Sequence, residues 1–243
     1  MRVLLLAGTM EARLIARALA AARLPAIASL AGATRTPEPL ALPTRIGGFG
    51  GGEGFHRFLK SNSITAVLDA THPFATAMSL RSAAICQAHG VPYMQFLRPA
   101  WIPSEGDRWT FLHTEADAAR HIPQDTTVFL ATGRETLDRF ADLAGRRLYV
   151  RVVDPPDMAF PYPPGDWVVG RPPYTLIQEC DLLLRLGVEW LVVKNSGGSS
   201  SRTKLDAARE LGIPVAMLRR PPQPEGPKIS TVSAAVAWAR THL

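Results

Sequence analysis

The sequence predicts an α/β protein made of two Rossmann-like, parallel-sheet domains with a ligand cleft between them. Short apolar runs alternate with helical segments along nearly the whole chain, which is typical of βαβ units with right-handed crossovers. The alternation starts again after residues 98–101, which indicates a second domain. Glycine and hydroxyl residues follow several apolar runs, at the strand ends where open α/β sheets bind their ligands.

The first predicted domain covers residues 1–100. Its apolar runs are short and flanked by turn residues, as buried parallel strands are. Its last helix closes on Gly90, because glycine is favoured just past a helix C-terminus. The predicted strands are 3–7, 27–30, 66–69 and 92–96, and the predicted helices are 10–22, 54–61 and 76–90.

The second predicted domain covers residues 101–243. Two proline-rich stretches, 154–165 and 221–227, must be loops, since proline cannot continue a helix or a central strand. The predicted strands are 109–112, 127–131, 147–152, 190–193 and 215–218, and the predicted helices are 115–121, 135–143, 174–186, 201–211 and 232–241.

Bulk composition favours a cytoplasmic globular protein. The chain has 243 residues, of which 47% are hydrophobic and 20% charged. Its first apolar run, residues 3–7, is too short for a signal h-region or a membrane span, and no other run approaches that length. Cys86 and Cys180 lie far apart in apolar helical contexts, which favours two buried thiols over a disulfide. The histidines have no metal-ligand spacing, so we expect no metal site.

The net charge of +6 and an isoelectric point near 9.8 call for an anionic partner. The basic residues are scattered, without a polybasic run or the aromatic interleaving of an RNA-binding surface, so we expect no nucleic acid. A polyanionic small molecule fits this distribution. Nothing in the sequence requires more than a monomer.

The first candidate site follows the first predicted strand. Gly8 and Thr9 form a strand-to-helix turn, and Glu11 begins the helix. Backbone amides and the helix dipole there suit a nucleotide pyrophosphate, although the full G-x-G-x-x-G fingerprint is missing and an unliganded turn stays open. After the second strand come Thr34 and Arg35, where an arginine suits a 2′-phosphate and favours NADPH over NADH; a solvated arginine is the alternative.

Two further segments of the first domain carry candidate cofactor contacts. Five of the six positions 47–52 are glycine, which favours close backbone approach of Gly47, Gly48 and Phe49 to a ligand over a flexible surface loop. The third predicted strand, 66–69, then leads to Ala70, Thr71 and His72. His72 titrates near neutral pH and is either a proton donor or a structural histidine.

The second domain gathers cationic and small polar residues at predicted strand ends. A glycine-rich loop at 194–199 and a second strand-to-helix turn at 132–134 are suited to hold anions. The candidate substrate-binding residues are Thr132, Gly133, Arg134, Arg151, Lys194, Asn195, Ser196, Gly197, Gly198, Ser199 and Lys204.

Taken in order, these segments resemble the precorrin-6A reductase family of cobalamin biosynthesis over essentially the whole chain. Ala7 and Met10 depart from the glycine and serine that many relatives have at these positions. The blocks that carry the resemblance are Ala-Gly-Thr-x-Glu-Ala-Arg (7–13), Gly-Gly-Phe-Gly-Gly (47–51), Asp-Ala-Thr-His-Pro-Phe-Ala (69–75), Arg-Pro-x-Trp (98–101), Thr-Gly-Arg (132–134), Lys-Asn-Ser-Gly-Gly (194–198) and Lys-Leu-Asp-Ala-Ala-Arg-Glu-Leu-Gly-Ile-Pro-Val (204–215).

The resemblance implies NADPH-dependent reduction of one ring double bond of precorrin-6A, a polycarboxylate tetrapyrrole, to the dihydro product. It also implies two α/β domains enclosing the active site. The cofactor would lie across the turn at 8–9, the glycine loop and residues 70–72, and the macrocycle would face 132–134 and 194–199.

Hydride transfer to a ring carbon must be followed by proton transfer to its neighbour. Lys204 and His72 are the candidate catalytic groups. Lys194, bound water and the substrate's own protonated nitrogens are also open, and we expect no single side chain to be indispensable. The alternatives are a cobalt-bearing substrate, a tetrapyrrole carrier without catalysis, and a methyltransferase that binds S-adenosylmethionine. A short-chain dehydrogenase is disfavoured, because none of the four tyrosines has a lysine four places on.

Overall fold

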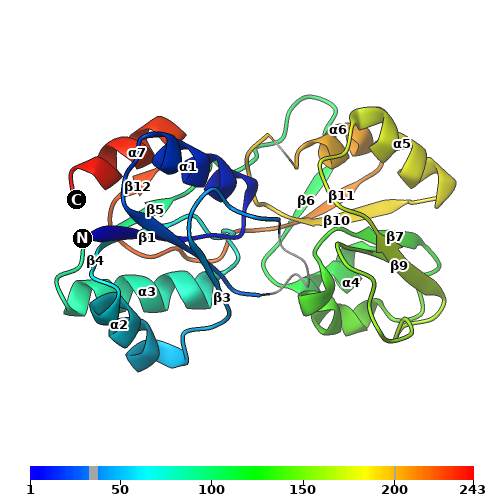
Figure 1. Cartoon of the computed structure of the whole chain (residues 1–243). Coiled ribbons are helices and arrows are strands. Elements are labelled where there is room, and N and C mark those ends of the chain that lie inside the picture. The colour runs from blue at the N-terminus through cyan, green and yellow to red at the C-terminus, as the bar shows by residue number, and fades with distance from the viewer. Residues whose placement is uncertain (33–37, 200) are drawn as a thin grey trace. The chain divides into compact units, whose positions relative to one another are not determined.

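The computed structural model describes residues 1–32, 38–199 and 201–243, and the chain divides into two compact units (Figure 1). Unit 1 contains Met1–Pro99 and Pro221–Leu243, and unit 2 contains Ala100–Arg220. Each unit has a six-stranded parallel sheet with flanking helices, which confirms the predicted α/β class. The assignment of 101–243 to one domain is wrong at its C-terminal end, because residues 221–243 return to unit 1.

Unit 1 has the strand order of a Rossmann sheet, β3-β2-β1-β4-β5-β12. The alternating side chains of β1 are buried on both faces: Val3 and Leu5 contribute to one core cluster, and Leu4 and Leu6 to the other. The elements are β1 (Arg2–Leu6), α1 (Met10–Ala21), β2 (Ala26–Leu30), β3 (Thr44–Ile46), α2 (Gly51–Ser61), β4 (Ile64–Asp69), α3 (Thr76–Ala88), β5 (Tyr93–Phe96), β12 (Lys228–Ile229) and α7 (Val232–Arg240).

The last strand of this sheet comes from the far end of the chain. Lys228 and Ile229 pair in parallel with Gln95 and Phe96 of β5. Helix α7 then packs beside α1 on one face of the sheet, while α2 and α3 cover the other (Figure 1). A two-residue strand has no periodicity to detect, so the sequence could not reveal this return.

Unit 2 has the order β6-β11-β10-β7-β8-β9, again entirely parallel. Strands β7 to β11 are ordered as β1 to β5 are in unit 1. The sixth strand of the sheet is β6, which precedes the other five in the chain and pairs with β11. The elements are β6 (Trp109–Leu112), the 3₁₀-helix η1 (Glu115–Asp117), α4 (Ala118–His121), β7 (Thr127–Leu130), the 3₁₀-helix η2 (Arg134–Leu143), β8 (Arg147–Val152), β9 (Gly165–Val169), α5 (Leu176–Arg185), β10 (Trp190–Lys194), α6 (Thr203–Glu210) and β11 (Val215–Leu218).

Three strands were not predicted: β3, β9 and β12. Strands β3 and β9 lie at sheet edges, where they are short or follow a proline-rich segment, and segment 134–143 forms a 3₁₀-helix rather than the predicted α-helix. Both cysteines are free thiols, and Cys86 is buried whereas Cys180 is partly exposed. Within the described ranges, no helix is long and apolar enough to cross a membrane.

The strand order reverses at one place in each sheet. In unit 1 it reverses between β1 and β4, and in unit 2 between β7 and β10. At such a switch point the two loops leave the carboxyl ends of neighbouring strands in opposite directions, which opens the crevice where α/β sheets bind ligands. The fold therefore provides one candidate site in each unit.

The return of α7 to unit 1 can be tested with a matched pair of substitutions. Ala235 is fully buried in the core of unit 1, and Ala237, two residues further along the same helix, is exposed. We expect Ala235→Asp to lower the free energy of unfolding by about 3 kcal/mol or more, because it buries a carboxylate. Ala237→Asp should cost only about 0.5 kcal/mol of helix propensity. Urea denaturation measures both, and equal effects would contradict the packing of α7.

Candidate functional site

Thr9 holds the two loops of the first switch point together. Its hydroxyl donates to the backbone oxygen of Ala70, at 2.9 Å, and accepts from the amide of Ala12, at 3.1 Å, as the N-cap of α1. A Cβ added to Gly8 would meet nothing within 4 Å, and Gly8 has a φ of +143°. Space for a ligand is therefore open beside the amino end of α1, where the helix dipole favours an anion.

Glu11 is not a free carboxylate at this site. It forms an ion pair with Arg98, which follows β5, and the two side chains are only 15% and 10% exposed. The pair joins the first turn of α1 to the end of β5. Arg98 was not predicted as a site residue, although it begins the Arg-Pro-x-Trp block.

A buried carboxylate fixes the loop after β4. Asp69 is 1% exposed, and its Oδ1 accepts from the amide and the hydroxyl of Thr71, at 2.9 and 2.7 Å. Its Oδ2 accepts from Tyr93 Oη at 2.6 Å, and burial together with this neighbouring charge raises the pKa of Tyr93. The Thr71 hydroxyl is therefore used to shape the loop, and neither Asp69 nor Tyr93 was predicted.

His72 lies next in this loop and is partly exposed. Its Nδ1 accepts a hydrogen bond from the Phe74 amide at 3.3 Å. In the neutral ring the hydrogen is then on Nε2, which leaves Nε2 as a donor.

The glycine loop is held by Arg45, which was not predicted as a site residue. Its guanidinium donates to the backbone oxygens of Gly47 and Gly48, at 2.7 and 2.8 Å, and to Ser29 Oγ of β2, at 2.8 Å. It also lies 4.0 Å from the centroid of the Phe49 ring. These contacts place the loop beside the carboxyl end of β2. The predicted 2′-phosphate contact, Arg35, lies outside the described residues.

The second switch point has a corresponding bridge. Lys194 Nζ donates to the backbone oxygen of Thr132 at 2.9 Å, which joins the ends of β10 and β7, and burial lowers the pKa of Lys194. Among the residues the structure describes, the buried hydroxyl of Thr132 has no hydrogen-bond partner. Gly133, with a φ of +83°, and the exposed Arg134 then lead into η2.

Hydrogen bonds from Trp101 and Arg220 hold the loop at 195–199 in place. The Asn195 side chain exchanges two hydrogen bonds with the backbone of Trp101, at 2.8 and 2.9 Å, and the Trp101 indole donates to the backbone oxygen of Gly198 at 2.7 Å. Arg220 donates to the backbone oxygens of Asn195 and Ser196, at 2.8 and 2.9 Å. The Asn195 amide thus holds the loop in place, and the left-handed Gly197 and Gly198 shape its turn.

Lys204 and Arg151 belong to one buried charged cluster. Arg151 forms a bidentate pair with Glu179, which is 1% exposed, through two hydrogen bonds of 2.7 Å. Lys204 donates to the backbone oxygen of Ser201 at 2.6 Å, and burial lowers its pKa to about 8 despite the nearby Glu179 carboxylate. The cluster therefore contains an ammonium group whose pKa lies well below that of an ordinary lysine.

The structure brings the predicted residues together in two groups. In unit 1 these are the residues around Gly8 and Ala70, with the glycine loop beside β2, and in unit 2 those around Thr132 and Lys194. The predicted cleft between the domains stays a prediction. The residues that sequence reasoning missed are mainly buried partners that hold these loops: Arg45, Asp69, Tyr93, Arg98, Trp101, Glu179 and Arg220.

Comparison with known proteins agrees over the full length of the chain. A family model described as precorrin-6x reductase CbiJ/CobK matches residues 2–240. A protein of Rhodococcus erythropolis named precorrin-6A reductase is 41% identical over 243 residues, which is 99% of this chain and 98% of the relative. One of Rhodobacter capsulatus with the same name is 39% identical over 242 residues, covering 99% and 96%.

A solved structure described as CobK precorrin-6A reductase matches with a TM-score of 0.95 at 39% identity, and the match covers 100% of this chain and 97% of that chain. This agreement in both sequence and fold bears out the resemblance drawn from the motifs. The chain belongs to the precorrin-6x reductase family.

Proposed function

We propose that this protein uses NADPH to reduce one ring double bond of precorrin-6A to the dihydro product, within cobalamin biosynthesis. The observation that carries the proposal is the switch point of unit 1. There, a Rossmann strand order places Gly8, Thr9 and the amino end of α1 around open space, in a chain of a reductase family. Work as a monomer in the cytoplasm stays a prediction from the sequence.

Unit 1 supplies the proposed cofactor site. The backbone of Gly8 and the first turn of α1 would hold the pyrophosphate, because amide donors and the helix dipole both favour phosphate there. The loop held by Arg45 lies next to β2, where the adenosine half binds in Rossmann folds, and Arg35 is proposed to contact the 2′-phosphate. Residues 70–72 would border the nicotinamide, which supplies the hydride when bound.

Unit 2 supplies the proposed substrate site. The cations Arg134 and Lys194, together with backbone amides at Gly133 and at 197–199, would form a surface suited to carboxylates. Precorrin-6A carries many acetate and propionate arms, and the net charge of +6 would attract it. The protein's part in the reaction is to orient the ring carbon that accepts hydride and to supply a proton to its neighbour.

We propose Lys204 as the group that supplies this proton. A buried ammonium group with a pKa of about 8 is mostly protonated at pH 7 and gives up its proton more readily than an ordinary lysine. His72, whose Nε2 is a donor, would hydrogen-bond a ligand at the other site. Water remains an alternative acid, which is why loss of Lys204 should slow the reaction without abolishing it.

The direct test is anaerobic mixing of the purified protein with metal-free precorrin-6A and NADPH, while nicotinamide and macrocycle absorbance are followed together. Coupled loss of NADPH and a macrocycle shift, faster than with NADH, is the expected result. If turnover occurs only with the cobalt-bearing precursor, that precursor is the substrate in place of metal-free precorrin-6A. Binding of both ligands without oxidation would indicate a carrier, and failure to bind either would refute the proposal.

Thr9 provides a prediction for the cofactor site. Thr9→Val removes both the helix cap and the bond to Ala70, so we expect the KM for NADPH to rise about tenfold, which corresponds to roughly 1.4 kcal/mol. Thr9→Ser keeps the hydroxyl and should stay within about twofold of the parent. Steady-state kinetics with each substrate varied in turn measures this, and similar values for valine and serine would contradict the role of the hydroxyl.

Lys204 provides a pH prediction. If it donates the proton, kcat should fall as the pH rises through about 8, where the ammonium is lost. Lys204→Met should lower kcat by about tenfold to a hundredfold and flatten this limb of the profile, with the KM for NADPH unchanged. An unchanged profile in the variant would remove Lys204 as the donor.

Stability measurements provide the control for that variant. Because the folded-state pKa is depressed from 10.5 to about 8, burial of the ammonium destabilises the fold below pH 8, and this penalty is relieved as the pH rises from about 8 to about 10.5. Lys204→Met should therefore raise the free energy of unfolding at pH 7, by on the order of 3 kcal/mol. If Lys204→Met loses turnover while its free energy of unfolding rises, the loss is not caused by unfolding.

A further inference from the structure

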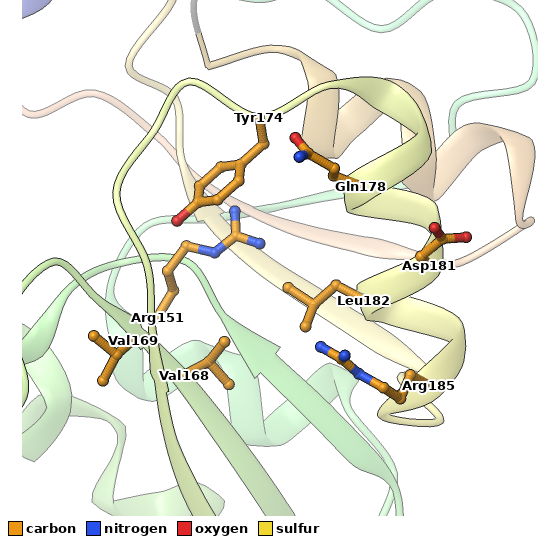
Figure 2. A pocket seen from close by; sticks show the side chains of 8 residues that line it. All are labelled: Arg151, Val168, Val169, Tyr174, Gln178, Asp181, Leu182 and Arg185. Atoms are coloured by element: carbon orange, nitrogen blue, oxygen red, sulfur yellow. The ribbon is translucent and has the colours of Figure 1, made fainter.

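A cavity of about 350 Å³ lies in unit 2, between α5 and the edge strand β9 (Figure 2). This volume is at the lower end of the range for small-molecule sites, about 300 to 1,000 Å³. The cavity begins near Tyr174, just before α5, and extends along the helix to Arg185. Of the predicted substrate-binding residues, Arg151 lines this cavity.

One wall of the cavity is apolar. Val168 of β9 faces Leu182 of α5 across it, whereas the side chain of Val169 points to the other side of the strand (Figure 2). Val168 and Leu182 are both partly exposed, so this wall leaves hydrocarbon surface in contact with water. Covering such a surface favours a ligand with an apolar body.

The charge of Arg151 is already compensated. Its two terminal nitrogens both bind the Glu179 carboxylate, and its guanidinium lies 4.4 Å from the Tyr174 ring centroid and 4.9 Å from that of Phe129. A side chain held in this way forms a rigid end to the cavity. It does not provide an uncompensated charge for a ligand.

Arg185 at the opposite end is different. Among the described residues it forms no ion pair or hydrogen bond through its side chain, and it lies on the exposed side of α5. In the view of Figure 2 its guanidinium is directed toward β9, whereas the carboxylate of Asp181 is directed away from β9. One cation therefore faces the apolar wall, four residues along α5 from Asp181.

We infer that this cavity receives one acid arm of the substrate together with the apolar edge of the ring that bears it, the carboxylate binding Arg185. The inference rests on the proposed function, because it takes a polycarboxylate tetrapyrrole as the substrate. Hydrocarbon against Val168 and Leu182 with a single carboxylate on Arg185 matches an acetate or propionate arm attached to a pyrrole-derived ring. The same chemistry would also admit a free carboxylic acid with an apolar body.

A fragment tests the cavity independently of turnover. The probe is a methyl-substituted pyrrole with a single propionate arm, and the matched control probe is its neutral carboxamide. Ligand-observed NMR should show millimolar binding of the acid and at least about fivefold weaker binding of the amide. Arg185→Glu should weaken binding of the acid about tenfold, whereas Arg120→Glu, the same charge change at a side chain 81% exposed elsewhere in unit 2, should not change it.

Kinetics then identify the source of the carboxylate. With the full protein, Arg185→Glu should raise the KM for precorrin-6A about fivefold to tenfold while kcat and the KM for NADPH stay at parent values, and Arg120→Glu should change none of them. Fragment binding with an unchanged KM would overturn the assignment to the substrate and leave a free carboxylic acid as the occupant. Absence of fragment binding with normal NADPH-dependent turnover would overturn the inference and leave the proposed function standing.

Discussion

The arrangement of this protein depends on the all-parallel pairing of its two sheets. Parallel neighbours cannot be joined by a hairpin, so each strand returns through a crossover, and loops leave the carboxyl ends of every strand at the same edge. Residues distant in the chain, such as Thr9 and Ala70, or Thr132 and Lys194, are brought together only in this way. The functional loops are therefore a consequence of strand direction.

At each switch point, a side chain on one loop donates a hydrogen bond to a backbone oxygen of the other loop. Thr9 makes this bond in unit 1 and Lys194 in unit 2. The loops on either side diverge, and without such a bridge their backbone carbonyls would have to be satisfied by water or ligand. The diverging loops are thus bridged by different groups in the two units, a hydroxyl in unit 1 and an ammonium group in unit 2.

Unit 2 keeps charged groups in its interior at a cost to stability. Lys204 and the Arg151–Glu179 pair are largely removed from water, and the desolvation of an ammonium group opposes folding even near a carboxylate. The apolar core around Phe129, Leu191 and Val215 has to offset that cost. Buried charges with shifted pKa values are often retained for chemistry, which is consistent with the role proposed for Lys204.

The sequence by itself determined the α/β class, nine of the strands and the loops that carry the motifs, because these depend on local periodicity and on glycine and hydroxyl residues at strand ends. Tertiary structure alone decided that residues 221–243 complete the first sheet, since a two-residue strand is defined only by its partner. It also decided which polar residues hold the site. Asp69, Trp101 and Glu179 act through contacts far apart in the chain, and no local pattern distinguishes them from ordinary surface or core residues.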